Sequence, residues 1–196
     1  MGRDEQRPLR ADARQNQERI LDAAIDRLGE DPRASVADIA QAAGVGRVTL
    51  YGHFPSREAL VEAAFVRLLD RGDEVLEQVD LSGDSRDALA QLVEVSWLLT
   101  AQAGSLLEAA RDVLAPGRVQ ELHDKPAQRM LGLLERGQQT GELRSDLPAA
   151  WMASAVHYLM KGAATESSRG LIDASEIPRL LTATILPAFS AQTAHD

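Results

Sequence analysis

The chain has 196 residues, no cysteine and a formal net charge of −9 at pH 7. Because cysteine is absent, it can form neither a disulfide bond nor a cysteine-ligated zinc site. The acidic charge is uneven: residues 1–71 carry 11 Lys and Arg against 12 Asp and Glu, whereas residues 72–196 carry 10 against 18. A polyanion such as DNA can therefore approach the first part of the chain, but the second part repels it.

The apolar segments are too short to cross a membrane. The most apolar stretch, residues 149–160, includes Ser154 and His157. It falls well short of the roughly 18 residues that a membrane span needs. The first twenty residues also lack the apolar core of a signal peptide. We therefore expect a soluble cytoplasmic protein with no membrane partner.

Helical periodicity runs through almost the whole chain and strand patterns are nearly absent, which predicts an all-α fold. Residues 1–14 are polar, rich in arginine and interrupted by Pro8, so we expect them to form a flexible arm. Apolar residues then recur at helical spacing over residues 15–28. Gly29 and Pro32 follow, and they predict the end of this first helix.

Two short helices are predicted within residues 36–54. Ser35 begins a capping-box pattern for the first of them, and Gly44 ends it. The second runs up to Phe54, because the proline that follows disfavours a helical conformation of the residue before it.

The residues between and within these two helices meet the conditions for a steep helix crossing. Ala40 is small enough for close approach, and Gly44 tolerates the positive φ that a tight turn requires. Ile39, Val45 and Leu50 are apolar, and their spacing lets them pack in the space between the two helices. Together these features predict a helix-turn-helix motif.

An ordinary helical hairpin meets the same conditions, so the outward face of the second helix decides between the two interpretations. If Leu50 and Phe54 point inward, the other side chains of that helix are exposed. Arginine can bond guanine in a bidentate fork, and Val or Thr can contact a thymine methyl group. Tyr and His can donate hydrogen bonds to phosphates. The residues with these properties are Arg47, Val48, Thr49, Tyr51 and His53. This surface favours DNA binding over packing alone.

The remainder of the chain is also predicted to be helical. Helices are expected at residues 56–79, 85–103, 105–114, 117–139, 148–168 and 173–191, separated by Gly, Pro and Asp. Pro126 either kinks the fourth of these or begins a new helix there. We place a three-helix DNA-binding domain at residues 15–58 and a second helical domain at residues 59–196.

Residues 43–60 resemble the signature of tetracycline-repressor (TetR) regulators, in which Thr-Leu-Tyr-x-x-Phe is followed by Ser-Lys/Arg-x-x-Leu. Here the two elements are residues 49–54 and residues 56–60. The resemblance covers about residues 18–65. It implies a repressor that binds a palindromic double-stranded DNA operator as a homodimer. It also implies that the second domain serves dimerisation and binds a small-molecule effector, unknown here, that releases the DNA.

The resemblance also implies roles for single residues. Arg47 and Val48 would face bases, and Thr49, Tyr51 and His53 would contact phosphates. Arg57, at the start of the following long helix, would clamp a further phosphate. Ala37 is too short to read a base, so base discrimination rests mainly on Arg47.

The last two helices carry apolar and small residues that fit the dimer interface of such regulators. The expected interface residues are Ala155, Tyr158, Gly162, Leu181 and Ile185. Bulky and adaptable residues of the central helices could line a ligand pocket, with one histidine as a polar group. These residues are Trp97, His123, Met130, Leu134, Trp151 and Met152. For both sets the alternative is that they belong to an ordinary core.

An enzymatic function finds no support in the sequence. It contains no HExxH, GxSxG or Walker motif, and the histidines lack the spacing of metal ligands. We therefore expect no catalytic residue, no cofactor and no metal. Two alternatives remain open: a helix-turn-helix regulator controlled by a partner protein, and a helical small-molecule carrier without DNA binding. The exposed Arg47, Thr49, Tyr51 and Arg57 argue against the carrier.

Overall fold

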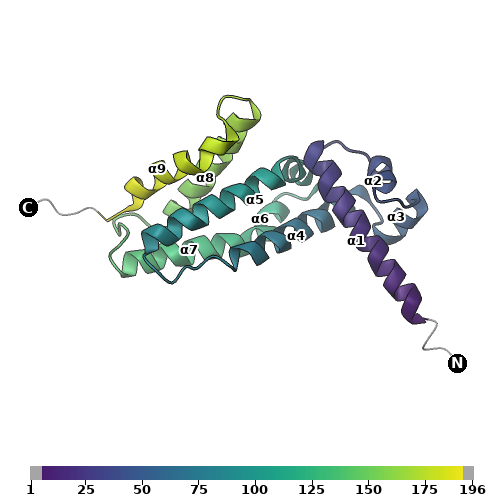
Figure 1. The fold of residues 1–196 in the computed structure, drawn as a ribbon, viewed down its shortest axis with the longest axis horizontal. Coiled ribbons are helices and arrows are strands. Elements are labelled where there is room, and N and C mark those ends of the chain that lie inside the picture. Colours follow the sequence, from purple (N-terminus) through teal and green to yellow (C-terminus); the bar gives the residue numbers. More distant parts are fainter. Residues whose placement is uncertain (1–5, 192–196) are drawn as a thin grey trace, which may run out of the picture. The chain divides into compact units, whose positions relative to one another are not determined.

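The computed structural model describes residues 6–191, without the side chains of residues 6–11, 102, 124 and 125. The helices are α1 (Gln6–Glu30), α2 (Val36–Ala42), α3 (Arg47–His53), α4 (Arg57–Leu76), α5 (Ser85–Val113), α6 (Arg118–Leu122), α7 (Asp124–Gln139), α8 (Ala149–Ser168) and α9 (Ile177–Phe189), with a short 3-10 helix at Ala174–Glu176 (Figure 1). Over residues 6–191 there is no β-strand, only an isolated bridge between Leu143 and Ser190. The all-α prediction is confirmed.

Apart from shifts of a few residues at helix ends, the helix boundaries differ from the expected ones at three places. Helix α1 begins at Gln6, so the expected arm is helical over the described residues 6–14, while residues 1–5 lie outside the described part. The expected helix at 117–139 is divided at His123, where α7 begins anew with Pro126 in its first turn. The expected gap before residue 105 is a break inside α5, at the non-helical Gly104.

The described helices form two compact units. The first contains the chain up to Asp70 together with Ala103–Leu122, and the second contains Arg71–Gln102 together with the chain from His123. Helices α4 and α5 therefore contribute residues to both units. The first unit also takes in residues 59–70 and 103–122, which were expected in the second domain.

The core of the first unit joins the two short helices to the longer ones. Helices α1, α2 and α3 contact one another, as Figure 1 shows. Its largest fully buried side chains are Ile20, Leu28, Ile39, Leu50, Leu60, Phe65 and Leu106. Because these residues come from α1 to α5, the short helices α2 and α3 are stabilised by packing, although helices of seven residues are unstable alone.

In the second unit α8 packs against both α7 and α9. The inward face of α9 repeats every fourth residue, at Ile177, Leu181, Ile185 and Phe189. The buried face of α8 consists of Ala149, Met152, Val156 and Met160. No helix among residues 6–191 is both long and apolar enough to cross a membrane.

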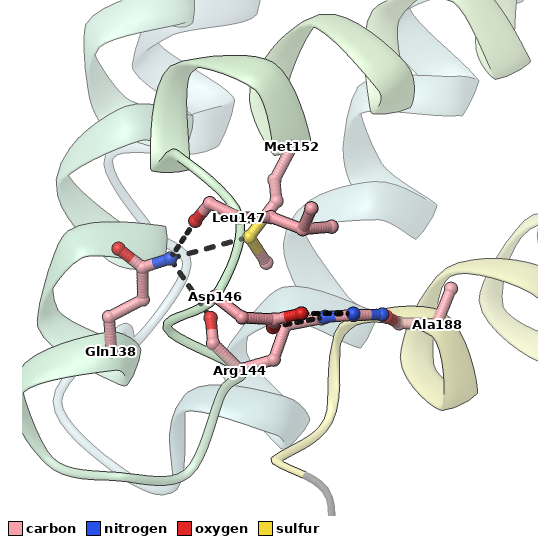
Figure 2. Close-up of polar contacts among 6 residues, drawn as sticks. All are labelled: Gln138, Arg144, Asp146, Leu147, Met152 and Ala188. Atoms are coloured by element: carbon pink, nitrogen blue, oxygen red, sulfur yellow. Dashed lines mark hydrogen bonds and ion pairs between the residues drawn. The ribbon is translucent and has the colours of Figure 1, made fainter.

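The connection between α7 and α8 is held by the side chain of Gln138. Its Nε2 donates hydrogen bonds to the backbone carbonyls of Arg144 at 2.9 Å and Leu147 at 2.8 Å, and it lies 3.5 Å from the sulfur of Met152 (Figure 2). One amide group thus satisfies two carbonyls of a loop that has no regular hydrogen-bond ladder.

Arg144 connects the same loop to the end of α9 through hydrogen bonds. Its guanidinium forms two hydrogen bonds with the carboxylate of Asp146, at 2.7 and 2.6 Å, and donates a third to the carbonyl of Ala188 at 3.1 Å (Figure 2). The hydrogen bonds from Arg144 lower the pKa of the Asp146 carboxyl. The loop is therefore tied to both helices that flank α8.

We predict that Gln138→Leu lowers the free energy of unfolding by about 1–3 kcal/mol, because two loop carbonyls lose their donor in a partly buried position. Thermal or urea unfolding followed by circular dichroism measures the effect. The matched control is Gln139→Leu, since Gln139 is exposed at the end of the same helix. Equal stabilities of the two variants would contradict the role given to Gln138.

Candidate nucleic-acid interface

The start of α2 is fixed by the capping box that the sequence predicted. The hydroxyl of Ser35 accepts from the backbone N–H of Asp38 at 3.2 Å, and the Asp38 carboxylate accepts from the backbone N–H of Ser35 at 2.9 Å. Hydrogen bonds from the Ser35 hydroxyl and N–H lower the pKa of the Asp38 carboxyl. The carboxylate is therefore retained well below neutral pH, and the cap with it.

The turn between α2 and α3 has the geometry expected of a helix-turn-helix. Gly44 has φ +66°, a conformation that L side chains rarely adopt. The N–H of Val45 donates to the carbonyl of Ala40 at 3.0 Å, and only 2% of Ala40 is exposed. The next helix begins after Gly46, which is extended and provides no side-chain cap.

Helix α3 is anchored by its inward side and presents the other side to solvent. Leu50 is completely buried and Phe54 is 5% exposed. Phe54 is extended, as expected of the residue before a proline, and ends the helix. On the outward side Val48 is 88% exposed and Tyr51 is 48% exposed.

The structure places the other expected DNA-binding residues of α3 at different depths. Arg47 and Thr49 are exposed beside Val48 and Tyr51. His53 is half-buried, and its ring centroid lies 6.4 Å from that of Phe54. One exposed face therefore combines a guanidinium, a hydroxyl, a phenol and an apolar side chain, which are the groups that can contact base edges and phosphates.

Arg57 is engaged with the loop between α1 and α2. Its guanidinium donates to the carbonyl of Pro32 at 2.9 Å and to the carbonyl of Ala34. The side chain is half-buried, and these bonds connect the start of α4 to the loop. A guanidinium has five N–H groups, so the phosphate contact expected of Arg57 stays a prediction beside this structural role.

An open groove of about 620 Å³ adjoins this face within the first unit. Both Arg47 and Tyr51 line it, together with Arg57. The groove also contains two charged residues that sequence reasoning missed, Arg33 and Asp112. The sequence offers one indication for Arg33. It is a cationic residue directly after Pro32, in the link between two helices.

The residues expected to line a ligand pocket fall into two groups. Trp97, Met130, Leu134 and Met152 are buried in the same core cluster of the second unit. Trp151 is 61% exposed on α8, so the structure does not bring it together with them. His123 is half-buried at the start of α7. Among the described residues, no group of three His, Asp or Glu side chains is arranged to hold a metal ion.

The residues expected at a dimer interface are also divided. Tyr158 is 68% exposed and Gly162 is exposed, whereas Ala155 is half-buried. Leu181 and Ile185 are 4% and 1% exposed, because they belong to the inward stripe of α9. They therefore form part of the core of their own unit, where they pack in one cluster with residues of α8.

The fold and this face define the class of the N-terminal part: it is a helix-turn-helix DNA-binding domain. Residues 20–64 match the family model described as "Bacterial regulatory proteins, tetR family". The DNA-binding domain of this chain therefore belongs to this family. The match covers α2, α3 and the adjoining parts of α1 and α4, so it rests on the DNA-binding domain.

Two characterised relatives are transcriptional repressors. Over 76 residues, or 38% of this chain, the sequence is 41% identical to the HTH-type transcriptional repressor LfrR of Mycolicibacterium smegmatis. Over 121 residues, or 58% of this chain, it is 32% identical to the HTH-type transcriptional repressor KstR2 of Rhodococcus jostii. These alignments span 40% of LfrR and 59% of KstR2, less than two thirds of either protein.

A solved structure extends the likeness over most of the chain. The TetR-like regulator LfrR from Mycobacterium smegmatis, in complex with proflavine, superposes with a TM-score of 0.69 at 25% identity. The superposition covers 88% of this chain and 94% of that one. The predicted arrangement, an N-terminal helix-turn-helix domain followed by a helical C-terminal part, is therefore confirmed.

Proposed function

We propose that this protein is a transcriptional repressor that binds an inverted-repeat DNA operator as a homodimer and releases it when a small molecule binds. The observation that carries the proposal is the outward face of α3. Arg47, Thr49 and Tyr51 are exposed there, while Leu50 behind them is fully buried. A solvent-exposed face of this composition on a rigidly anchored helix suits insertion into a major groove.

The dimer is proposed from the exposed faces of α8 and α9. Trp151 and Tyr158 lie seven residues apart on α8 and are 61% and 68% exposed. On α9, Leu180 is 37% exposed beside the buried Leu181. Large apolar side chains exposed at the surface are typical of a protein–protein contact. A second copy of the same two helices would cover them.

The effector is proposed to bind in the second unit. That unit contains Trp97, Met130 and Met152, whose bulky and flexible side chains can rearrange around an apolar ligand. The related LfrR has been solved with proflavine, a bound small molecule. Helix α4 contributes residues to both units, so it offers a covalent route by which ligand binding could change DNA affinity. Coupling of this kind typically amounts to about 1–3 kcal/mol.

A selection from random-sequence DNA duplexes tests the proposal without assuming any operator sequence. The full-length protein is expected to enrich an inverted repeat whose two halves lie about one helical turn apart. Enrichment of a single half-site would contradict the dimer. Failure to enrich any sequence would contradict the proposed function, and it would favour a helical carrier instead.

A further inference from the structure

The groove beside α3 is positively charged in a chain that is acidic overall. Among the residues that the structure describes, three guanidinium groups line it, those of Arg33, Arg47 and Arg57, and the one acidic residue in the lining is Asp112. The whole chain carries a net charge of −9. Since Arg47 and Tyr51 also belong to the exposed face of α3, the groove continues that face toward the loop between α1 and α2.

Arg33 lies in a loop that is held in place on both sides. Its backbone N–H donates to the carboxylate of Asp31 at 2.9 Å, and the N–H of Ala34 donates to the carbonyl of Asp31 at 3.0 Å. The carbonyls of Pro32 and Ala34 accept from the guanidinium of Arg57. The backbone of Arg33 is thus fixed while the residue remains exposed. Less conformational entropy is lost when such a preorganised group binds.

Asp112 brings a negative charge into the same groove from the last turn of α5. It is exposed, and Ala109 and Val113 of the same helix also line the groove. A carboxylate here repels any phosphate that enters, over distances up to the Debye length of about 8–10 Å at physiological salt. The lining therefore combines attraction by arginines with repulsion by one acid.

We propose that this groove receives the sugar–phosphate backbone of the DNA whose major groove α3 enters. Arg33 neutralises a phosphate there, whereas the carboxylate of Asp112 repels the phosphates and lowers the affinity for DNA. The inference rests on the proposed function and adds two residues to it, neither of which belongs to the recognition helix. It commits to DNA backbone as the occupant because the net charge of the lining is positive and Arg47 and Tyr51 share that lining.

The test uses the full-length protein and the duplex enriched by the selection described above. For each half-site, Arg33→Ala is expected to reduce the salt slope of binding by about 0.9 and to weaken binding up to about tenfold at 0.1 M salt, so the slope of the dimer should fall by about 1.8. The loss should be similar on the enriched duplex and on a duplex of scrambled sequence. Asp112→Asn is expected to bind both duplexes about two- to fourfold more tightly, because a repulsive charge has been removed.

Matched controls lie on α5 outside the lining of the groove. Arg111→Ala removes a positive charge next to Asp112, and Glu108→Gln removes a negative charge one turn earlier. Both residues are exposed. Both controls should leave the salt slope unchanged, and thermal unfolding should confirm that all four variants are folded.

The outcomes separate this inference from the function on which it rests. An unchanged salt slope in Arg33→Ala, with a wild type that binds the enriched duplex, would overturn the backbone contact and leave the regulator intact. A loss confined to the enriched duplex would overturn it as well, because Arg33 would then read bases. A wild type that enriches and binds no duplex would overturn the proposed function and the groove with it.

Discussion

The Gly162→Glu variant is expected to be monomeric at micromolar concentration and to bind operator DNA on the order of 10²–10⁴-fold more weakly than the wild type. Gly162 is exposed on α8, and a Cβ placed there meets no atom of another element within 4 Å. The new side chain therefore fits the single protomer. In a dimer built on the exposed faces of α8 and α9 it would place an unpaired charge in the contact.

Protomer stability distinguishes a lost dimer from a damaged fold. Glycine is disfavoured in a helix interior by roughly 1 kcal/mol relative to good helix formers, so Gly162→Glu should not lower the stability of the protomer itself. The control Gly162→Ala makes the same helix-stabilising change without a charge and should remain dimeric. Light scattering measures the mass in each case. A dimeric Gly162→Glu variant with full DNA affinity would place the interface elsewhere.

The Arg47→Ala variant is expected to lose about 1–3 kcal/mol of specific binding per half-site and to relax the preference at one base pair of each half-site. Arg47 is the long cationic side chain at the first position of α3, where it is exposed. It can therefore reach a guanine edge, while Val48 beside it offers only an apolar contact. Binding selection on the variant measures the change in preference.

Arg111→Ala is the control for Arg47→Ala, because it removes an exposed guanidinium from the same unit but outside the groove. It should leave the selected sequence unchanged. If Arg47→Ala also selects the wild-type sequence and loses affinity equally for all duplexes, Arg47 contacts only phosphates. The base-reading role would then be wrong.

The helix-turn-helix could be predicted from sequence because its determinants are local. Ser35 with Asp38, Gly44 and the buried Leu50 each satisfy a requirement within a few residues of the chain, and the structure confirms all of them. The environment of Arg57 could not be predicted in this way. Its hydrogen-bond partner Pro32 lies 25 positions away, and no sequence pattern connects the two.

The faces of α9 show a second limit of sequence patterns. The apolar stripe of this helix is broad, so periodicity alone does not tell which edge is inward. Leu181 and Ile185 were expected at the dimer contact and are buried in the core, whereas the neighbouring Leu180 is partly exposed. A shift of one residue rotates a helix face by about 100°, which is enough to exchange core for surface.

The spacing of half-sites decides whether two copies of the α3 face read one DNA duplex together. Inserting five base pairs between the halves of the selected repeat turns them about half a helical turn apart. We expect two chains on the original duplex, and a loss of affinity on the altered duplex to the level of a single half-site. Equal affinity for both duplexes, or one chain bound to the original, would contradict it.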